Sequence, residues 1–103
     1  MSAKIVYHFE WNAAKARTNL RKHGVSFRAA TGVFRDQLAL TTYDDEHSET
    51  EERWVTLGRT ENGQYLVVVH TFAHVSELET HIRIISARAA DRQEIRDYEQ
   101  APR

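Results

Sequence analysis

The sequence of 103 residues contains no cysteine, one proline, four glycines and no long hydrophobic run. Without cysteine, the chain forms neither a disulfide nor a cysteine-ligated zinc or iron–sulfur site. No segment approaches the roughly 20 apolar residues needed to cross a bilayer, and the first residues do not resemble a signal peptide. We therefore expect a soluble, cytoplasmic protein that does not bind membranes.

Several motifs that carry chemistry are also missing, among them a glycine-rich phosphate loop, HExxH, an EF-hand loop and GxSxG. His70 and His74 are four residues apart, but they lie in or just after a predicted strand. On a strand, that spacing does not bring two imidazoles together as it does on a helix. The sequence therefore predicts neither a metal site nor a cofactor.

Charge is low overall but unevenly distributed. The formal net charge is -1, which would ordinarily argue against a nucleic-acid-binding protein. However, Glu10 is the only acidic residue up to Arg35, whereas Asp36 to Glu52 contains seven acidic residues and no lysine or arginine. A basic surface is therefore compatible with the total, with the acidic segment on another face or acting as its internal counterion.

The length and the 41% hydrophobic content predict one domain, spanning residues 1–103. The order of predicted elements is a strand (4–11), two helices, strands and a C-terminal helix. Asn12 caps the first helix and Gly24 ends it, Ser26 caps the second, and Asp91 with Glu94 begins the last. The remaining strands are predicted at 38–43, 53–59, 64–72 and 81–88, with an Asn-Gly turn joining the middle two. We therefore predict an α+β fold with a mostly antiparallel sheet of about four strands after the helical hairpin.

Two of the segments that connect these strands also carry local signals. In the acidic stretch before the second of these strands, Ser48 and Glu51 have the spacing of a capping box and predict one helical turn. Residues 74–80 are polar and predict a loop rather than a strand.

Arginines on the predicted strands are the main positive signal for a site: Arg53, Arg59, Arg83 and Arg88. A central antiparallel strand has little room for charge unless one sheet face is open to solvent or to a ligand. The irregular alternation in residues 81–88 suggests a bulge near Ile84 and Ile85, although a simple strand end would explain it too. A bulge would bring Arg83, Ser86 and Arg88 closer to a common edge. His47, in the acidic loop, is a candidate for proton transfer, and a surface role is equally compatible with the sequence.

Three stretches, in this order, resemble the BrnT family of toxins from bacterial type II toxin–antitoxin systems. They are FEWNAAKARTNLRKHGVSF (9–27), DDEHSETEERW followed by LGR (44–59), and RIISAR (83–88). The resemblance extends from Phe9 to about Tyr98, although residues 71–81 look longer than in many relatives. It implies a RelE-like fold, a metal-independent endoribonuclease that arrests translation by cutting RNA, and a BrnA-like ribbon-helix-helix antitoxin. DNA would be bound only indirectly, through the toxin–antitoxin complex.

Metal-free cleavage can use the 2′-hydroxyl of the RNA as nucleophile, so the protein supplies proton transfer and positive charge around the phosphate. We assign Arg59, Arg83 and Arg88 to phosphate contacts, and His47 with Arg53 to proton transfer or its support. The cluster of Arg21, Lys22 and His23 fits either the end of a helix or the binding of an anion. We favour a helix end for His23 and Gly24, and RNA binding for Lys22 and Ser86.

A second hypothesis is a non-catalytic module that docks an antitoxin or another protein. Burial of Arg83 and Arg88 in internal ion pairs would favour this hypothesis, whereas an arginine cluster on an open sheet face would favour the nuclease.

Overall fold

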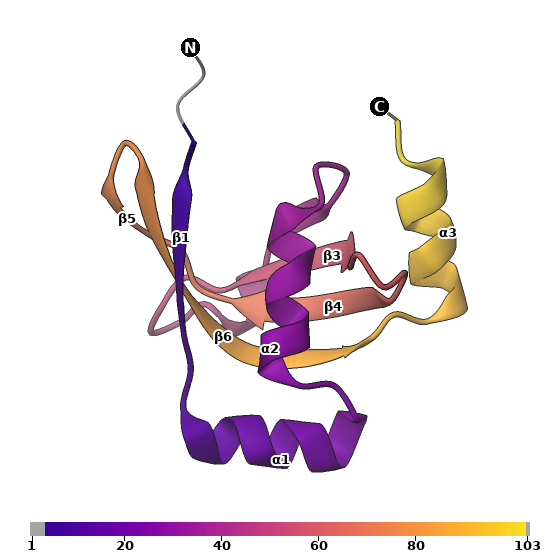
Figure 1. Ribbon diagram of the computed structural model, residues 1–103, viewed down its shortest axis with the longest axis horizontal. Helices are drawn as coiled ribbons and strands as arrows, with labels where there is room; N and C mark the ends of the chain where they lie inside the picture. The colour runs from indigo at the N-terminus through magenta and orange to yellow at the C-terminus, as the bar shows by residue number, and fades with distance from the viewer. Residues whose placement is uncertain (1–3, 103) are drawn as a thin grey trace.

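The computed structural model describes residues 4–102. In chain order, the elements are β1 (Val6–Glu10), α1 (Ala13–His23), α2 (Phe27–Ala30), the 3₁₀ turn η1 (Thr31–Arg35), β2 (Leu40–Tyr43), the 3₁₀ turn η2 (Asp45–His47), β3 (Trp54–Arg59), β4 (Tyr65–His70), β5 (Ala73–Ser76), β6 (Glu79–Ala89) and α3 (Arg92–Gln100). Figure 1 shows α2 and η1 lying across one face of the sheet, α1 beneath it and α3 beside the ends of β3 and β4.

The sheet has six strands in the order β1-β6-β4-β3-β2, with β5 also paired to β6. The α+β class is confirmed, but the prediction of about four strands was wrong. The connection at 74–80 contains the additional strand β5 and turns back into β6, and β1 joins the same sheet by pairing in parallel with β6. The partner of β1 is far away in sequence, which a local pattern does not reveal, whereas β5 and β6 form a short local hairpin in a polar stretch.

Side-chain caps fix the helix starts at the predicted positions. Asn12 Oδ1 accepts from Lys15 N at 3.0 Å, and Ser26 Oγ accepts from Ala29 N at 3.0 Å. Asp91 and Glu94 form a reciprocal capping box at the start of α3. α1 ends at Gly24, whose φ of 69° lies in the left-handed region that favours glycine. These local signals place α1, α2 and α3 correctly along the chain.

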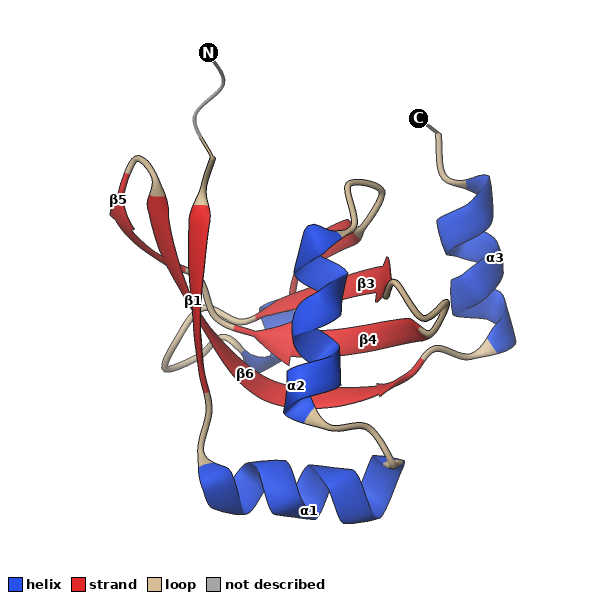
Figure 2. Ribbon diagram, in the orientation of Figure 1, coloured by secondary structure: helices blue, strands red, loops and turns tan. Residues whose placement is uncertain are grey.

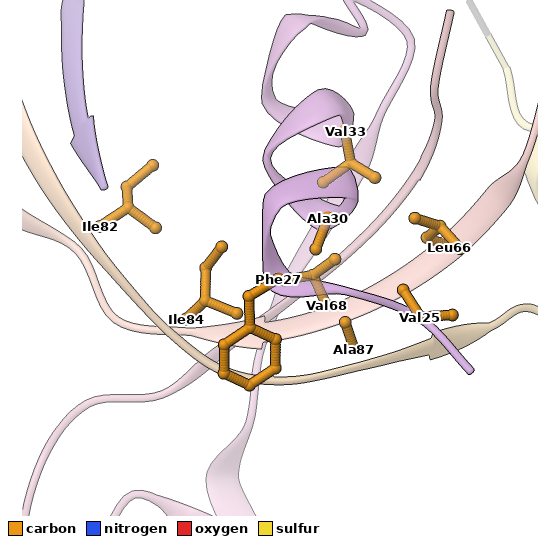
Figure 3. Packing of buried hydrophobic residues seen from close by; sticks show 9 residues of the cluster. All are labelled: Val25, Phe27, Ala30, Val33, Leu66, Val68, Ile82, Ile84 and Ala87. Atoms are coloured by element: carbon orange, nitrogen blue, oxygen red, sulfur yellow. The ribbon is translucent and has the colours of Figure 1, made fainter. Parts of the chain in front are cut away.

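The hydrophobic core lies between α2 with η1 and the sheet. Figure 3 shows Phe27, Ala30 and Val33 facing Leu66 and Val68 of β4 and the isoleucines and alanine of β6. A Cβ on Gly58 would lie 2.8 Å from Cβ of Val33, so the glycine allows η1 to approach β3 closely. The core therefore fixes the strands that carry the arginines.

α1 is joined to the free edge of β6 by one buried side chain. Asn19 Nδ2 donates to Ala87 O at 2.8 Å and to Val25 O at 3.0 Å, while Asn19 Oδ1 accepts from Ala87 N at 3.1 Å. These bonds satisfy backbone groups of β6 beyond the end of its pairing with β1. As a result, the basic face of α1 is held beside the second half of β6.

β1, β5 and the first half of β6 extend away from the helices as a separate ribbon, which is plain in the strand colouring of Figure 2. Apolar side chains on or beside this ribbon are well exposed, namely Ile5, Val6, Tyr7, Val75 and Leu78. We call these three strand segments the β-ribbon.

Candidate functional site

The structure divides the predicted site residues between two ends of the sheet. Arg53 directly precedes β3, and Arg59 ends it six residues later, about 20 Å away at the rise of an extended strand. On β6, Arg83 lies near the Arg53 end and Arg88 lies toward the Arg59 end. The four arginines therefore do not form a single cluster.

The expected bulge is present in β6. Ile84 pairs with His70 and Ser86 pairs with Val69, which leaves Ile85 as the extra residue. Because Ile84 and Ala87 are buried in the core, alternation about this bulge turns Arg83, Ser86 and Arg88 toward the opposite face. All three are at least partly exposed there.

Glu51 joins the two arginines at the first end. Its Oε2 accepts a hydrogen bond from Arg83 Nη2, and its Oε1 lies 3.5 Å from Arg53 Nη2. Arg83, the nearer guanidinium, lowers the pKa of Glu51 chiefly by this hydrogen bond, and Arg53 adds to the effect. Arg53 Nε is buried and has no hydrogen-bond partner within the described part of the chain. Glu51 is therefore an ionised carboxylate at neutral pH, held between two guanidinium groups.

A hollow of about 320 Å³ lies beside this cluster, and we call it the Arg83 hollow. It is lined by Asn12, Lys15, Glu51, Arg83, Ile84 and Ile85. Arg83 retains 41% exposure of its side chain, so its guanidinium is paired but not buried. Two cations and one carboxylate therefore face a space that is open to a ligand.

A second hollow, also of about 320 Å³, continues along α1 and shares Lys15 and Ile85 with the first. Its remaining lining residues are Ala14, Thr18, Asn19, Lys22, His23 and Ser86. The predicted RNA-binding residues Lys22 and Ser86 therefore lie on opposite walls of one groove, Lys22 from α1 and Ser86 from β6. We call the two adjoining hollows the α1–β6 groove.

Arg88 makes a different kind of ion pair. Its two Nη atoms donate to the two carboxylate oxygens of Glu94 at 2.8 and 2.9 Å, and Nη1 also donates to Ala89 O at 3.3 Å. The hydrogen bond from Arg88 is the main reason that the pKa of Glu94 is lowered. Since Glu94 Oε1 also accepts from Asp91 N, this pair fastens the start of α3 to β6.

Arg59 lies at the same end, with its guanidinium 5.5 Å from the ring centre of Tyr65. Its backbone N donates to Asp36 Oδ2 at 2.8 Å. A hollow of about 410 Å³ there is lined by Gly32, Arg35, Asp36, Leu38, Arg59, Thr60, Glu61 and Tyr98. None of its lining residues belongs to the Arg83 hollow.

His47 is at the end of η2, with 62% of its side chain exposed, and its Nδ1 lies 3.0 Å from Asp44 Oδ2. The predicted helical turn beginning at Ser48 is not formed. Instead, Ser48 Oγ donates to Asp44 O and accepts from Arg53 N at 3.0 Å, which closes the loop. This bonding leaves Glu51 free of a capping role and directed to Arg83.

Sequence reasoning did not select Glu51 or Lys15 as site residues. Glu51 was assigned to a capping box, and Lys15 was given no role of its own. Both occur in the stretches that carried the family resemblance, but Glu51 contacts Arg83 across 32 positions of sequence and Lys15 joins them from α1. No local spacing rule reports such a contact.

Two observations bear on other classes of function. Among residues 4–102, no group of three histidine, aspartate or glutamate side chains is arranged to hold a metal ion. No helix in the same range has the length and apolar character needed to cross a membrane.

Comparison with known proteins agrees with this architecture. Residues 11–94 match the model of a family described as the ribonuclease toxin BrnT of type II toxin–antitoxin systems. The crystal structure of the ribonuclease toxin BrnT from Brucella abortus is similar in fold, with a TM-score of 0.54 and 22% sequence identity, over 88% of this chain and all of that one. No curated protein sequence matches the chain. Because the family model covers most of the sequence, including α1, the acidic loop and β6, the chain belongs to the BrnT family of ribonuclease toxins of type II toxin–antitoxin systems.

Proposed function

We propose that this toxin is a metal-independent endoribonuclease that inhibits translation, and that it binds the phosphate to be cleaved in the Arg83 hollow. The observation that carries the proposal is that Arg83, from β6, and Lys15, from α1, line one open space, and that Arg53 meets Arg83 through Glu51 beside it. Guanidinium groups stay charged and bind phosphate oxygens through paired N–H donors. They suit a reaction in which negative charge rearranges around phosphorus.

The α1–β6 groove supplies a path for the rest of the strand. Lys22 and Ser86 line its far half, and Lys15 belongs to both halves. Cationic side chains spaced along a groove follow the backbone of single-stranded nucleic acid, and their contribution weakens as salt increases. RNA lying in this groove would place one phosphate beside Arg83 and a neighbouring nucleotide between Lys22 and Ser86.

In this proposal, three of the candidate residues do not contact the reacting phosphate, namely Arg59, Arg88 and His47. Arg88 and Arg59 lie at the opposite end of the sheet, where Arg88 is bound to Glu94 and Arg59 packs on Tyr65. His47 does not line the Arg83 hollow. We therefore assign the contacts with the reacting phosphate to Arg53 and Arg83, and keep the other three for the outer course of the RNA or for stability.

The test is cleavage of end-labelled single-stranded RNA by the purified protein in excess EDTA. Arg83→Ala is compared with Arg88→Ala, since both arginines lie on β6 and both are paired with a glutamate. We expect cleavage by the parent, a loss of about 100-fold or more in Arg83→Ala, and near-parental cleavage in Arg88→Ala. Equal losses in two folded variants would contradict the assignment of the site.

Inhibition of translation needs its own measurement. Added to a cell-free translation reaction that makes a reporter protein, the parent should lower the yield of the reporter and Arg83→Ala should not. If naked RNA is left intact, the same reaction with intact ribosomes shows whether cleavage requires them. A folded parent that cleaves RNA in neither setting would favour the alternative of a non-catalytic module that docks an antitoxin. The two arginine ion pairs give that alternative only partial support, because 41% of the Arg83 side chain and 44% of the Arg88 side chain are exposed.

The partner of this toxin would be a BrnA-like antitoxin with a ribbon-helix-helix DNA-binding domain, as the family resemblance implies. The exposed apolar residues of the β-ribbon support a protein partner, because apolar side chains left exposed close together are common at interfaces. In a gel-shift assay with the operator of the toxin–antitoxin pair, we expect binding by the complex and none by the toxin alone. Binding by the toxin alone would contradict an indirect link to DNA.

A further inference from the structure

Glu51 is unusual among the residues that line the Arg83 hollow. It is the one acidic side chain among the described lining residues, whereas Lys15 and Arg83 are cationic and Asn12, Ile84 and Ile85 are neutral. A carboxylate in a phosphate site repels the negatively charged ligand and so weakens its binding. The position of Glu51 therefore requires an explanation beyond phosphate binding.

The contacts of Glu51 indicate that its carboxylate is not needed to hold the loop. Its two oxygens contact only the guanidinium groups of Arg53 and Arg83 among the described residues. The loop is closed instead by Ser48, through bonds to Asp44 and Arg53. By contrast, Glu94 at the other end accepts from a backbone N–H as well as from its arginine. Glu51 is therefore free to exchange its partners when a ligand arrives.

Its protonation state fits a proton acceptor. The hydrogen bond from Arg83, followed by the charges of Arg83 and Arg53, lowers the pKa of Glu51, so the carboxylate is ionised at neutral pH. From α1, Lys15 lines the same hollow and adds positive charge. A phosphate that takes over the N–H donors of Arg83 would remove the main cause of this shift. The carboxylate would then become a stronger base once the substrate is bound.

We propose that Glu51 is the general base of the cleavage reaction and takes the proton from the 2′-hydroxyl of the nucleotide whose phosphate lies on Arg53 and Arg83. This inference rests on the proposed ribonuclease function and names a catalytic residue for it. It follows from the Arg83 hollow, in which the carboxylate of Glu51 lies against the guanidinium of Arg83, with Arg53 beside its other oxygen.

The step balances without any further reactant. The 2′-hydroxyl proton moves to Glu51, the 2′ oxygen forms a bond to phosphorus, and the bond from phosphorus to the 5′ oxygen breaks. The departing 5′ oxygen takes a proton from solvent water, to which the hollow is open, and protonated Glu51 later returns its own proton to water. The products are a 2′,3′-cyclic phosphate and a 5′-hydroxyl end.

His47 is the other candidate for this role, but its surroundings fit less well. Its ring is directed to Asp44, and it does not contribute to the lining of the Arg83 hollow. A general base must come within hydrogen-bond reach of the proton that it removes. Glu51 lies next to any phosphate bound by Arg83, since its carboxylate already contacts that guanidinium.

The test compares Glu51→Gln with Glu52→Gln. Both changes remove one negative charge from the same loop, but Glu52 is exposed and does not line the hollow. We expect Glu51→Gln to lower the single-turnover cleavage rate by about 100-fold or more. An RNA with a 2′-deoxy nucleotide at the cleavage site provides no proton to remove. Glu51→Gln should bind this RNA as tightly as the parent does, or more tightly. Glu52→Gln should cleave like the parent.

The pH profile separates a base from a residue that only positions Arg83. In the parent, the rate should fall on the acidic side as Glu51 takes up a proton, and this limb should be absent from the residual activity of Glu51→Gln. Parental cleavage by Glu51→Gln, or an unchanged acidic limb, would overturn the role of Glu51 while the ribonuclease function stood. If the parent did not cleave RNA at all, the proposed function itself would fail.

Discussion

The two ends of the sheet carry the same ingredients in different arrangements. Each has one arginine on or beside β3, one arginine on β6 and a glutamate that pairs with the β6 arginine. At the Arg88 end, Glu94 belongs to the capping box of α3, and its carboxylate is held by both the backbone and the guanidinium. At the Arg83 end, Glu51 is bound by arginines alone, beside a hollow that also contains Lys15.

This difference shows that an arginine–glutamate ion pair does not by itself identify a functional site. The Arg88 pair makes a junction between a strand and a helix, and both partners have fixed structural duties. The Arg83 pair makes no such junction, because the loop that carries Glu51 is closed by Ser48. What distinguishes a candidate site is charge that the fold does not use, placed next to open space.

The contrast between the two ends is tested most directly by substituting the two arginines at the ends of β3, Arg53 and Arg59. Arg53→Ala should lower RNA cleavage by about 100-fold, because it removes a donor from the phosphate site, whereas Arg59→Ala should stay within about threefold of the parent. Cleavage rates under saturating protein, with circular dichroism to verify folding, give the measurement. Arg53→Lys should recover only part of the rate, since an ammonium group lacks the paired donors of guanidinium. A larger loss in folded Arg59→Ala than in Arg53→Ala would reverse the assignment of the two ends.

Asn19 lies between the two ends and joins α1 to β6. Asn19→Ala would leave the backbone groups of Ala87 and Val25 without these partners in a buried place, at a cost of about 3 kcal/mol in the free energy of unfolding. Urea denaturation measures this loss. Thr18→Ala, on an exposed neighbouring position, serves as the control and should change stability by less than about 0.5 kcal/mol. Equal effects of the two changes would show that Asn19 does not join the elements.

The extent to which the sequence predicted the molecule follows from the range of the interactions involved. The caps at Asn12, Ser26 and Asp91 act within three residues, and each was predicted correctly. The strand count was wrong because the parallel pairing of β1 depends on a distant partner and because β5 lies in a polar stretch that was predicted to be a loop. The arginines were identified by their unusual place on strands, but their separation into two ends depends on register along β3 and β6. The contact of Glu51 with Arg83 spans 32 residues and left no local signal.

His70 distinguishes the two ends in a further way, because it pairs with Trp54 and Ile84 near the Arg83 end. It is fully buried, and burial lowers its pKa from 6.5 to about 4. The unfolded chain therefore takes up a proton below about pH 6.5 while the folded protein does not until about pH 4, so this group reduces stability as pH falls through that window. The reduction should amount to roughly 3 kcal/mol.

Urea denaturation between pH 4 and 7 tests this expectation. The slope of stability against pH should be smaller in His70→Gln than in the parent, even though the variant is less stable at pH 7. His23→Gln removes an exposed histidine and should retain the parental slope. An unchanged slope in His70→Gln would mean that the buried imidazole is not the source of the pH dependence.

The smallest expected effect concerns the Arg88 end. Glu94→Gln keeps a hydrogen-bonding side chain in the capping box and removes only the charge, so it should cost about 1 kcal/mol of stability at pH 7. Because the folded-state pKa of Glu94 is lowered, the stabilisation is present above its ordinary value of 4.5 and is lost as pH falls through the lower folded value. Parent and variant should therefore become equally stable once the pH has fallen below that lowered value. The pKa of Glu51 is also lowered, so Glu51→Gln should cost some stability at pH 7, but less than Glu94→Gln because the Glu51 loop is closed by Ser48. A larger loss in Glu51→Gln than in Glu94→Gln would remove the contrast between the ends.

The parallel pairing of β1 with β6 also has a consequence for the order in which the toxin is made. Val6 pairs with Glu79 and Glu10 pairs with Arg83, so the first strand has no partner until about four-fifths of the chain has been synthesised. Contacts so distant in sequence form late, because a long loop must close before they are gained. Arg83 itself arrives with the last strand, and the hollow beside it needs α1 from the beginning of the chain. A nascent chain that has not yet reached β6 therefore lacks the candidate site, although α1 has already been made.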